Sequence, residues 1–110
     1  MQNEYGIKLD ANGYAPSIIQ DSYDSCWLCG MSGSNLNRHE VFGGPYREKS
    51  KRLGLWVVLH HEPCHVYGAQ AIHQNPENNR RLKAEAQQAA MDHYGWTVQD
   101  FIFEFGKNYL

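Results

Sequence analysis

The sequence has no long hydrophobic run and only three cysteines. No apolar stretch approaches the roughly 18 residues that span a bilayer, so we expect no membrane-spanning helix. The first ten residues lack the basic and then apolar order of a secretory signal. We therefore expect a soluble, cytoplasmic protein, in a reducing setting where thiolates bind metal more readily than they form disulfides. Internal repeats and low-complexity tracts are also absent.

By length the 110 residues correspond to a single domain, with an N-terminal arm expected over residues 1–24 and the folded domain over residues 25–110. A domain of this size buries a limited core and gains from a structural metal. The net charge of −2 divides unevenly, because residues 26–83 carry eight Lys and Arg against four Glu, a net +4. Such a positive region suits a polyanionic partner, although an ordinary solvated surface would give the same distribution.

Two segments have the β-branched and apolar content of strands. They cover residues 36–42 and 53–59, and the second, LGLWVVL, is the more apolar. A Gly-Gly-Pro sequence ends the first strand, and the connection over residues 46–52 is basic and too polar to be buried. We expect this connection to be a long hairpin loop that contacts phosphate, or alternatively a loop that is merely solvated.

Two helices are predicted near the C-terminal end by the residues at their boundaries. The first begins after Asn75, a good N-cap followed by proline, and stops at Gly95. The second starts at Thr97, with an acidic residue three positions on, and ends before Gly106. Apolar residues recur at helical spacing in both, so their aromatic side chains are expected in the core. Strands and helices together indicate an α+β fold.

The three cysteines have the spacing of a zinc site. Cys26 and Cys29 form a CxxC knuckle, and Cys64 lies beside several histidines. A tetrahedral structural zinc needs four Cys or His ligands, which are commonly supplied as a CxxC pair and a later pair. His60 and His61 are both close enough in sequence to Cys64 to be the fourth ligand, and we name His60 first.

A second group of histidines surrounds the same stretch. His39 lies in the first predicted strand, His65 follows the last cysteine and His73 precedes the long helix. If the hairpin packs on the segment after it, these three side chains converge on an open metal site of the kind that hydrolyses phosphodiesters. Glu40 is the neighbour of His39 on a strand and points to the opposite side unless a bulge re-aims it.

The order of these motifs resembles a known family. A CxxC knuckle, a strand ending in HEVFGG, a basic RxxS segment, GLWVVL, Cys-His, AIH and a closing FGKNYL are similar to small phage and prophage HNH-type nucleases. These belong to the ββα-metal, or His-Me finger, group, some of whose relatives are recombination-associated. The resemblance covers residues 13–110. It implies a zinc knuckle, a β-hairpin and a helix forming a ββα-metal finger, with C-terminal helices.

The resemblance also implies an activity and roles for single residues. It implies a cytoplasmic phage or prophage endonuclease that cuts DNA with one divalent ion, Mg²⁺ or Mn²⁺, besides a structural Zn²⁺. His39 matches a metal-site position, His65 and His73 match metal ligands, and Glu40 stands where the general base is often His. Either Glu40 takes the proton, or His39 does so. In relatives the zinc set is commonly four cysteines, so His60 stands in place of a Cys.

Basic residues around the first strand and the connection are the expected phosphate contacts. They are Arg38, Arg47, Lys49, Lys51 and Arg52. DNA is the expected partner, and a phage or host recombination or packaging protein is a further one. Two other functions are compatible with the same motifs: a non-catalytic zinc module that binds nucleic acid or protein, and a nuclease-like scaffold that inhibits a host factor.

Overall fold

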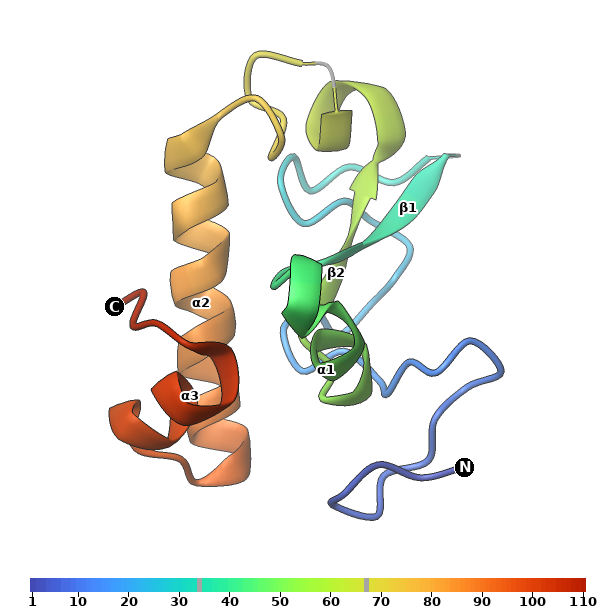
Figure 1. Ribbon diagram of the computed structural model, residues 1–110. Coiled ribbons are helices and arrows are strands. Elements are labelled where there is room, and N and C mark those ends of the chain that lie inside the picture. The colour runs from blue at the N-terminus through green and yellow to red at the C-terminus, as the bar shows by residue number, and fades with distance from the viewer. Residues whose placement is uncertain (34, 67) are drawn as a thin grey trace.

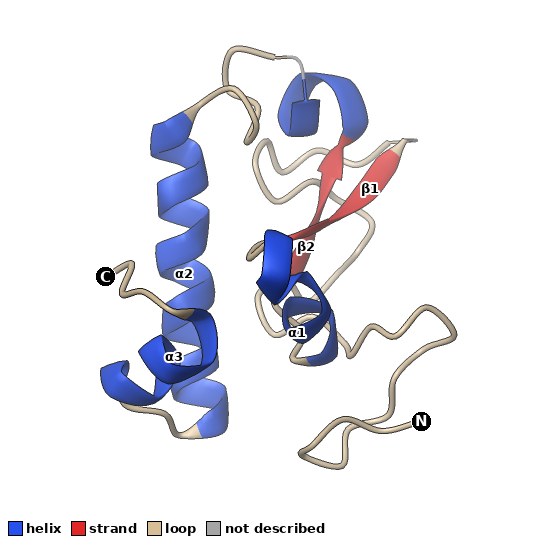
Figure 2. Ribbon diagram, viewed as in Figure 1, coloured by secondary structure: helices blue, strands red, loops and turns tan. Residues whose placement is uncertain are grey.

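A computed structural model describes residues 1–33, 35–66 and 68–110 of the chain. The elements follow one another as β1 (Leu36–Glu40), a 3₁₀ turn η1 (Gly44–Tyr46), α1 (Arg47–Arg52), β2 (Trp56–His60), a π-helical turn η2 (His61–Val66), α2 (Pro76–Tyr94) and α3 (Val98–Phe105). The fold is therefore a small α+β domain, as the sequence predicts. In Figure 2 α2 and α3 lie on one side of the hairpin, and the N-terminal segment lies on the other.

The sheet consists of β1 and β2 paired antiparallel, with Leu36 opposite His60 and Glu40 opposite Trp56. Both strands are shorter than the expected 36–42 and 53–59. The second begins later because Gly54 adopts φ +76 and turns the chain immediately before it. The backbone N–H of Val41 still donates to the carbonyl of Leu55, so the pairing fades gradually rather than stopping at Glu40.

The connection between the strands is a helix, so the prediction of a long basic loop is wrong. Pro45 occupies the first turn of η1, where its fixed φ favours helical backbone. Ser50 of α1 is fully buried, and its hydroxyl donates to the carbonyl of Leu55 and accepts from the backbone N–H of Phe42. This buried hydroxyl fastens a short charged helix to the base of the hairpin.

Both predicted C-terminal helices are confirmed, together with their caps. The side chain of Asn75 accepts from the backbone N–H of Asn78, and Gly95 ends α2 in the left-handed region at φ 70. Thr97 and Asp100 exchange hydrogen bonds at the start of α3, which is a capping box. These capping hydrogen bonds join residues close together in the sequence. The sequence alone was therefore sufficient to predict where both helices begin and end.

The core lies between the hairpin and the two C-terminal helices. Strand β2 is buried over Trp56–Leu59, and α2 and α3 contribute apolar side chains that are fully buried. The main members are Leu55, Val57, Leu59, Leu82, Ala86, Ala90, Phe101 and Phe105. This packing determines which face of α2 is turned towards β1. It therefore also determines where the side chains of the site described below lie.

The N-terminal arm covers the edge of β2 that does not pair with β1. The backbone N–H of Val58 donates to the side chain of Gln20, and the Trp56 indole donates to the carbonyl of Ala15 at 2.8 Å. The backbone N–H of Ile18 donates to the carbonyl of Gly54. These bonds satisfy an edge that would otherwise be open to another strand. Among the residues that the structure describes, no helix is long and apolar enough to cross a membrane.

Candidate metal centre

Two groups of side chains could hold a metal ion, and η2 contributes to both, with Cys64 in one and His65 in the other. The first is a Cys₃His group formed by Cys26, Cys29, His60 and Cys64. One ligand atom of each residue lies within 4.8 Å of every other, and His60 Nδ1 is 3.3 Å from Cys29 Sγ and 3.9 Å from Cys64 Sγ. Ligands of a tetrahedral zinc, with bonds of about 2.0–2.3 Å, have separations of roughly 3.5 Å. The group is therefore close enough to bind a metal ion.

The knuckle around the first two cysteines is built by backbone hydrogen bonds. The N–H of Cys26 donates to the carbonyl of Met31, and the N–H of Gly30 donates to the carbonyl of Cys26. The N–H of Trp27 donates to Val58 at 2.9 Å, which fastens the knuckle to β2 beside His60. Of the two histidines considered as fourth ligand, His60 belongs to the group, whereas His61 is exposed.

The pKa values of these thiols differ although their sulfurs are neighbours. Burial alone would raise the pKa of Cys26, but backbone N–H groups, first that of Cys29, point at its sulfur and lower it to about 7. Burial, followed by the neighbouring Cys26 sulfur, raises the pKa of Cys64 to about 12. Without a cation the group thus favours one thiolate, and a zinc ion would stabilise the others as thiolates.

The second group consists of the three histidines expected from the sequence. His39 is the last residue but one of β1, His65 comes from η2 and His73 from the loop before α2. The loop is folded back on η2 because the N–H of His73 donates to the carbonyl of His65 at 3.1 Å. His65 Nε2 then lies 3.2 Å from His39 Nδ1 and 3.0 Å from His73 Nε2.

These separations match nitrogens that share one ion. Two nitrogens about 2.1 Å from a metal are roughly 3.0–3.4 Å apart for the usual coordination angles. The opposite ring nitrogens, Nε2 of His39 and Nδ1 of His65, are buried and lack a hydrogen-bond partner among the described residues. Packing, rather than hydrogen bonds to these far ring nitrogens, therefore orients the two rings.

The three rings are arranged in order of increasing exposure. His39 is 8% exposed, His65 is half-buried and His73 is exposed. Burial, followed by the charges of His65 and His73, lowers the pKa of His39 to about 3. Burial also lowers the pKa of His65. Both rings are therefore neutral near pH 7, which is the form that binds metal.

Glu40 lies beside this histidine group but is held by a cation. The side chain of Glu40 is 9% exposed and accepts a 2.8 Å hydrogen bond from Nε of Arg47. Burial would raise the pKa of the Glu40 carboxyl, but the Arg47 hydrogen bond, with a smaller contribution from Tyr14, keeps it below its usual value. Glu40 is thus a carboxylate near pH 7.

An open hollow of about 450 Å³ brings the three histidines and Glu40 together. His39, His65 and His73 line it, and so does Glu40, although alternation along β1 had suggested that Glu40 points away. Its other polar lining comes from Arg38, Arg47, Asn79 and Lys83. Asn79 and Lys83 were missed from the sequence, because nothing local indicates which face of the long helix looks towards β1.

Each of the five expected phosphate contacts is paired with a carboxylate. Their partners are Asp10 for Arg38, Glu40 for Arg47, Glu104 for Lys49, Glu48 for Lys51 and Glu4 for Arg52. Arg38 also lies 4.3 Å from the centre of the Tyr14 ring. Of these five residues, only Arg38 and Arg47 line the histidine hollow. The basic charge of α1 is therefore largely directed at the rest of the protein.

Comparison with known proteins gives no match: no protein-family model matches the chain, and no curated protein or solved structure is significantly similar to it. The resemblance to HNH-type nucleases therefore rests on the sequence motifs alone.

Proposed function

We propose that the protein is a metal-dependent endonuclease of the HNH type that hydrolyses phosphodiester bonds of DNA. One observation carries this proposal. Three imidazole nitrogens converge within 3.0–3.2 Å of their neighbours in an open hollow that also holds a carboxylate and an arginine. A structural site needs a closed shell, whereas a hydrolytic site keeps open positions and nearby charged groups.

The histidines would hold a single divalent ion, with the exposed His73 on the solvent side. Such an ion supplies positive charge that stabilises the phosphate and the leaving oxygen during hydrolysis. Three imidazoles suit transition-metal ions, while Mg²⁺ prefers oxygen ligands and keeps several waters. Of the two ions expected from the resemblance, Mn²⁺ therefore fits these ligands better than Mg²⁺.

Glu40 is the proposed proton acceptor for the attacking water. His39 is the most buried of the three converging rings, and its Nδ1 is directed at the other two, so it serves as a ligand rather than as the base. Glu40 lines the same hollow as a carboxylate. Arg47 is 65% exposed and orients Glu40 through their hydrogen bond, which leaves its remaining N–H groups for a phosphate oxygen.

The second candidate is a non-catalytic module that binds nucleic acid on the same scaffold. It is favoured by the ion pair of Glu40 with Arg47, because a carboxylate held by arginine is a weaker base than a free imidazole. In both cases the Cys₃His group would bind Zn²⁺ and stabilise the small core. A phage or prophage origin and a cytoplasmic location are part of the proposal.

Nicking of a supercoiled plasmid separates the two candidates. We expect zinc-loaded protein to nick the plasmid when Mn²⁺ is added, and His39→Ala to abolish nicking while its zinc content and circular dichroism stay unchanged. His93→Ala is the matched control, since His93 is an exposed histidine on α2 whose ring contacts, among the described aromatic rings, only that of Tyr94, edge to face. Retained cleavage in His39→Ala would reject the site. DNA binding without any Mn²⁺-dependent nicking would favour the module.

A further inference from the structure

The cations of the chain fall into two classes. Of the ten Lys and Arg, five make the ion pairs described above. The other five have no carboxylate partner within the described parts of the chain. They are Lys8, Arg80, Arg81, Lys83 and Lys107. Three of these lie on the first half of α2 and one follows α3, so most of the unpaired cations belong to the C-terminal part of the chain.

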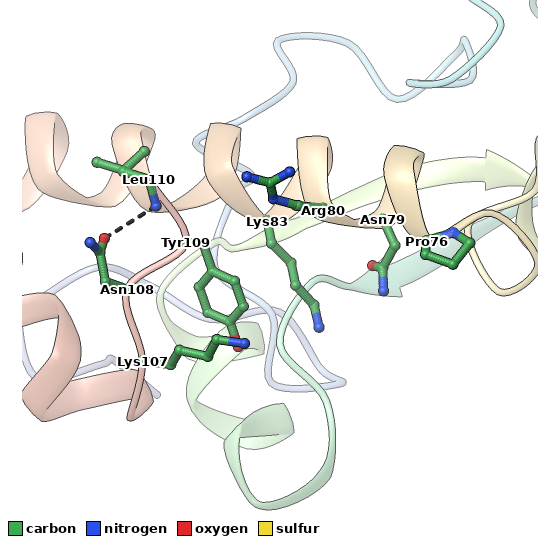
Figure 3. Close-up of a pocket in the computed structure, with 8 residues that line it drawn as sticks. All are labelled: Pro76, Asn79, Arg80, Lys83, Lys107, Asn108, Tyr109 and Leu110. Atoms are coloured by element: carbon green, nitrogen blue, oxygen red, sulfur yellow. Dashed lines mark hydrogen bonds between the residues drawn. The ribbon is translucent and has the colours of Figure 1, made fainter.

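A pocket of about 300 Å³ lies between α2 and the C-terminal tail, and Figure 3 shows its lining. Lys83 and Lys107 stand on either side of the Tyr109 ring, each with its ammonium group 5.4 Å from the ring centre. Asn79 points to the same side, and Arg80 adds a third cation to the lining. None of the described lining residues is Asp or Glu.

The tail that carries Lys107 is held in place by the core. Gln87 of α2 is fully buried; its amide donates to the Asn108 side chain at 2.9 Å and accepts from the Tyr109 N–H at 2.7 Å. The Tyr109 ring packs on Phe42 with a centroid distance of 5.4 Å. The buried scaffold therefore holds the tail beside α2, so that both lysines line one pocket.

This pocket continues the histidine hollow. Asn79 and Lys83 line both, so the two cavities adjoin along α2. A chain of phosphates that enters the hollow would meet Lys83 next, followed by Lys107. A nucleic-acid strand carries a phosphate at every nucleotide, so a strand bound in the hollow also presents phosphates to the adjoining pocket.

We propose that Lys83 and Lys107, with Arg80 beside them, bind the backbone phosphates of the DNA strand adjacent to the scissile one. This inference rests on the proposed function, since the same strand is placed in the histidine hollow. The ligand is recognised through its phosphates, so the site contributes affinity and register without base specificity. The residues of α1 named from the sequence contribute less, because carboxylates of the protein already occupy them.

The test is binding of a fluorescein-labelled DNA duplex by zinc-loaded protein without added Mn²⁺, measured by anisotropy between 50 and 200 mM salt. We expect Lys83→Gln and Lys107→Gln each to weaken binding by about three- to tenfold and to reduce the slope of log K against log salt by about one. Lys8→Gln is the control, because Lys8 is an exposed, unpaired lysine on the arm. It should change the affinity less than twofold.

Variants at either lysine that bind like the wild type, or a Lys8→Gln effect of equal size, would overturn the inference. Displacement of the DNA by polyglutamate at the same charge concentration would also do so, since a site built for carboxylates would not select phosphates. His39→Ala separates the two claims. It should lose nicking and keep binding, whereas binding that depends on the lysines in a protein that never nicks would reject the nuclease and retain the phosphate site.

Discussion

The carboxylate of Glu40 accepts a 2.8 Å hydrogen bond from Nε of Arg47, beside the three converging histidines. This pair joins β1 to the first residue of α1 and so depends on the helix that replaced the expected loop. The pair both orients the carboxylate and weakens it as a base. The proposed nuclease activity therefore depends on which of these two effects is larger.

Substitution of Glu40 shows whether Arg47 mainly orients the carboxylate or mainly weakens it as a base. We expect Glu40→Gln to lower the rate of plasmid nicking in Mn²⁺ by about 10²- to 10⁴-fold, the usual contribution of a general base. Glu40→His should restore a large part of the rate, because an imidazole at this position accepts a proton near neutral pH. The Mn²⁺ affinity of both variants serves as the control. An unchanged rate in Glu40→Gln would remove Glu40 from the mechanism.

The Cys₃His group is expected to determine stability. Cys26→Ser should lose zinc by elemental analysis and lower the melting temperature by roughly 10 °C or more, since zinc binding in small domains contributes directly to folding. His60→Cys is the matched variant, because it exchanges one zinc ligand for another. It should retain one zinc per chain. Wild-type thermal stability in zinc-free Cys26→Ser would show that the group is not structural.

Metal binding should release few protons, because burial lowers the pKa values of His39 and His65. A lowered pKa keeps these rings neutral as the pH falls, so the ion need not displace their protons. Calorimetry of Mn²⁺ binding at pH 5.5 in buffers of different ionisation enthalpy counts the protons released. We expect fewer than two, whereas three histidines with the ordinary pKa of about 6.5 would release nearly three. A count near three would contradict the burial of the site.

Gly54 and Gly95 form a natural pair for testing how the arm is attached. Both have positive φ, 76 and 70, but a Cβ at Gly54 would collide with the carbonyl oxygen of Pro16, while a Cβ at Gly95 would meet nothing within 4 Å. Gly95→Ala should cost about 1 kcal/mol of unfolding free energy from backbone strain alone. Gly54→Ala should cost clearly more, measured by denaturant unfolding. Equal costs would mean that the arm does not pack against this turn.

Local signals account for the parts of the fold that the sequence predicted correctly. Asn75 and Thr97 are caps whose hydrogen bonds involve residues three positions away, so each helix start is visible in a few letters. Helix α1 has no such signal. Its six residues carry no apolar periodicity, and it forms because Ser50 is buried against the hairpin, a contact that depends on the whole fold.

The candidate site likewise has residues that the sequence alone could predict and residues that required the fold. Spacing was sufficient to group the cysteines, and the histidine order placed His39, His65 and His73 together, as the structure does. The choice of His60 over His61 required the strand register, since His60 is the last residue of β2. Lys83 and Lys107 carried no motif at all. They line one pocket because Gln87 holds the tail against α2.

Anomalous diffraction from crystals grown with Zn²⁺ and soaked in Mn²⁺ tests the central claim most directly, with data collected at both metal edges. The account predicts a zinc peak among Cys26, Cys29, His60 and Cys64 and a separate manganese peak among His39, His65 and His73, about 2.2 Å from each facing nitrogen. A zinc peak without any metal between the three histidines would contradict it.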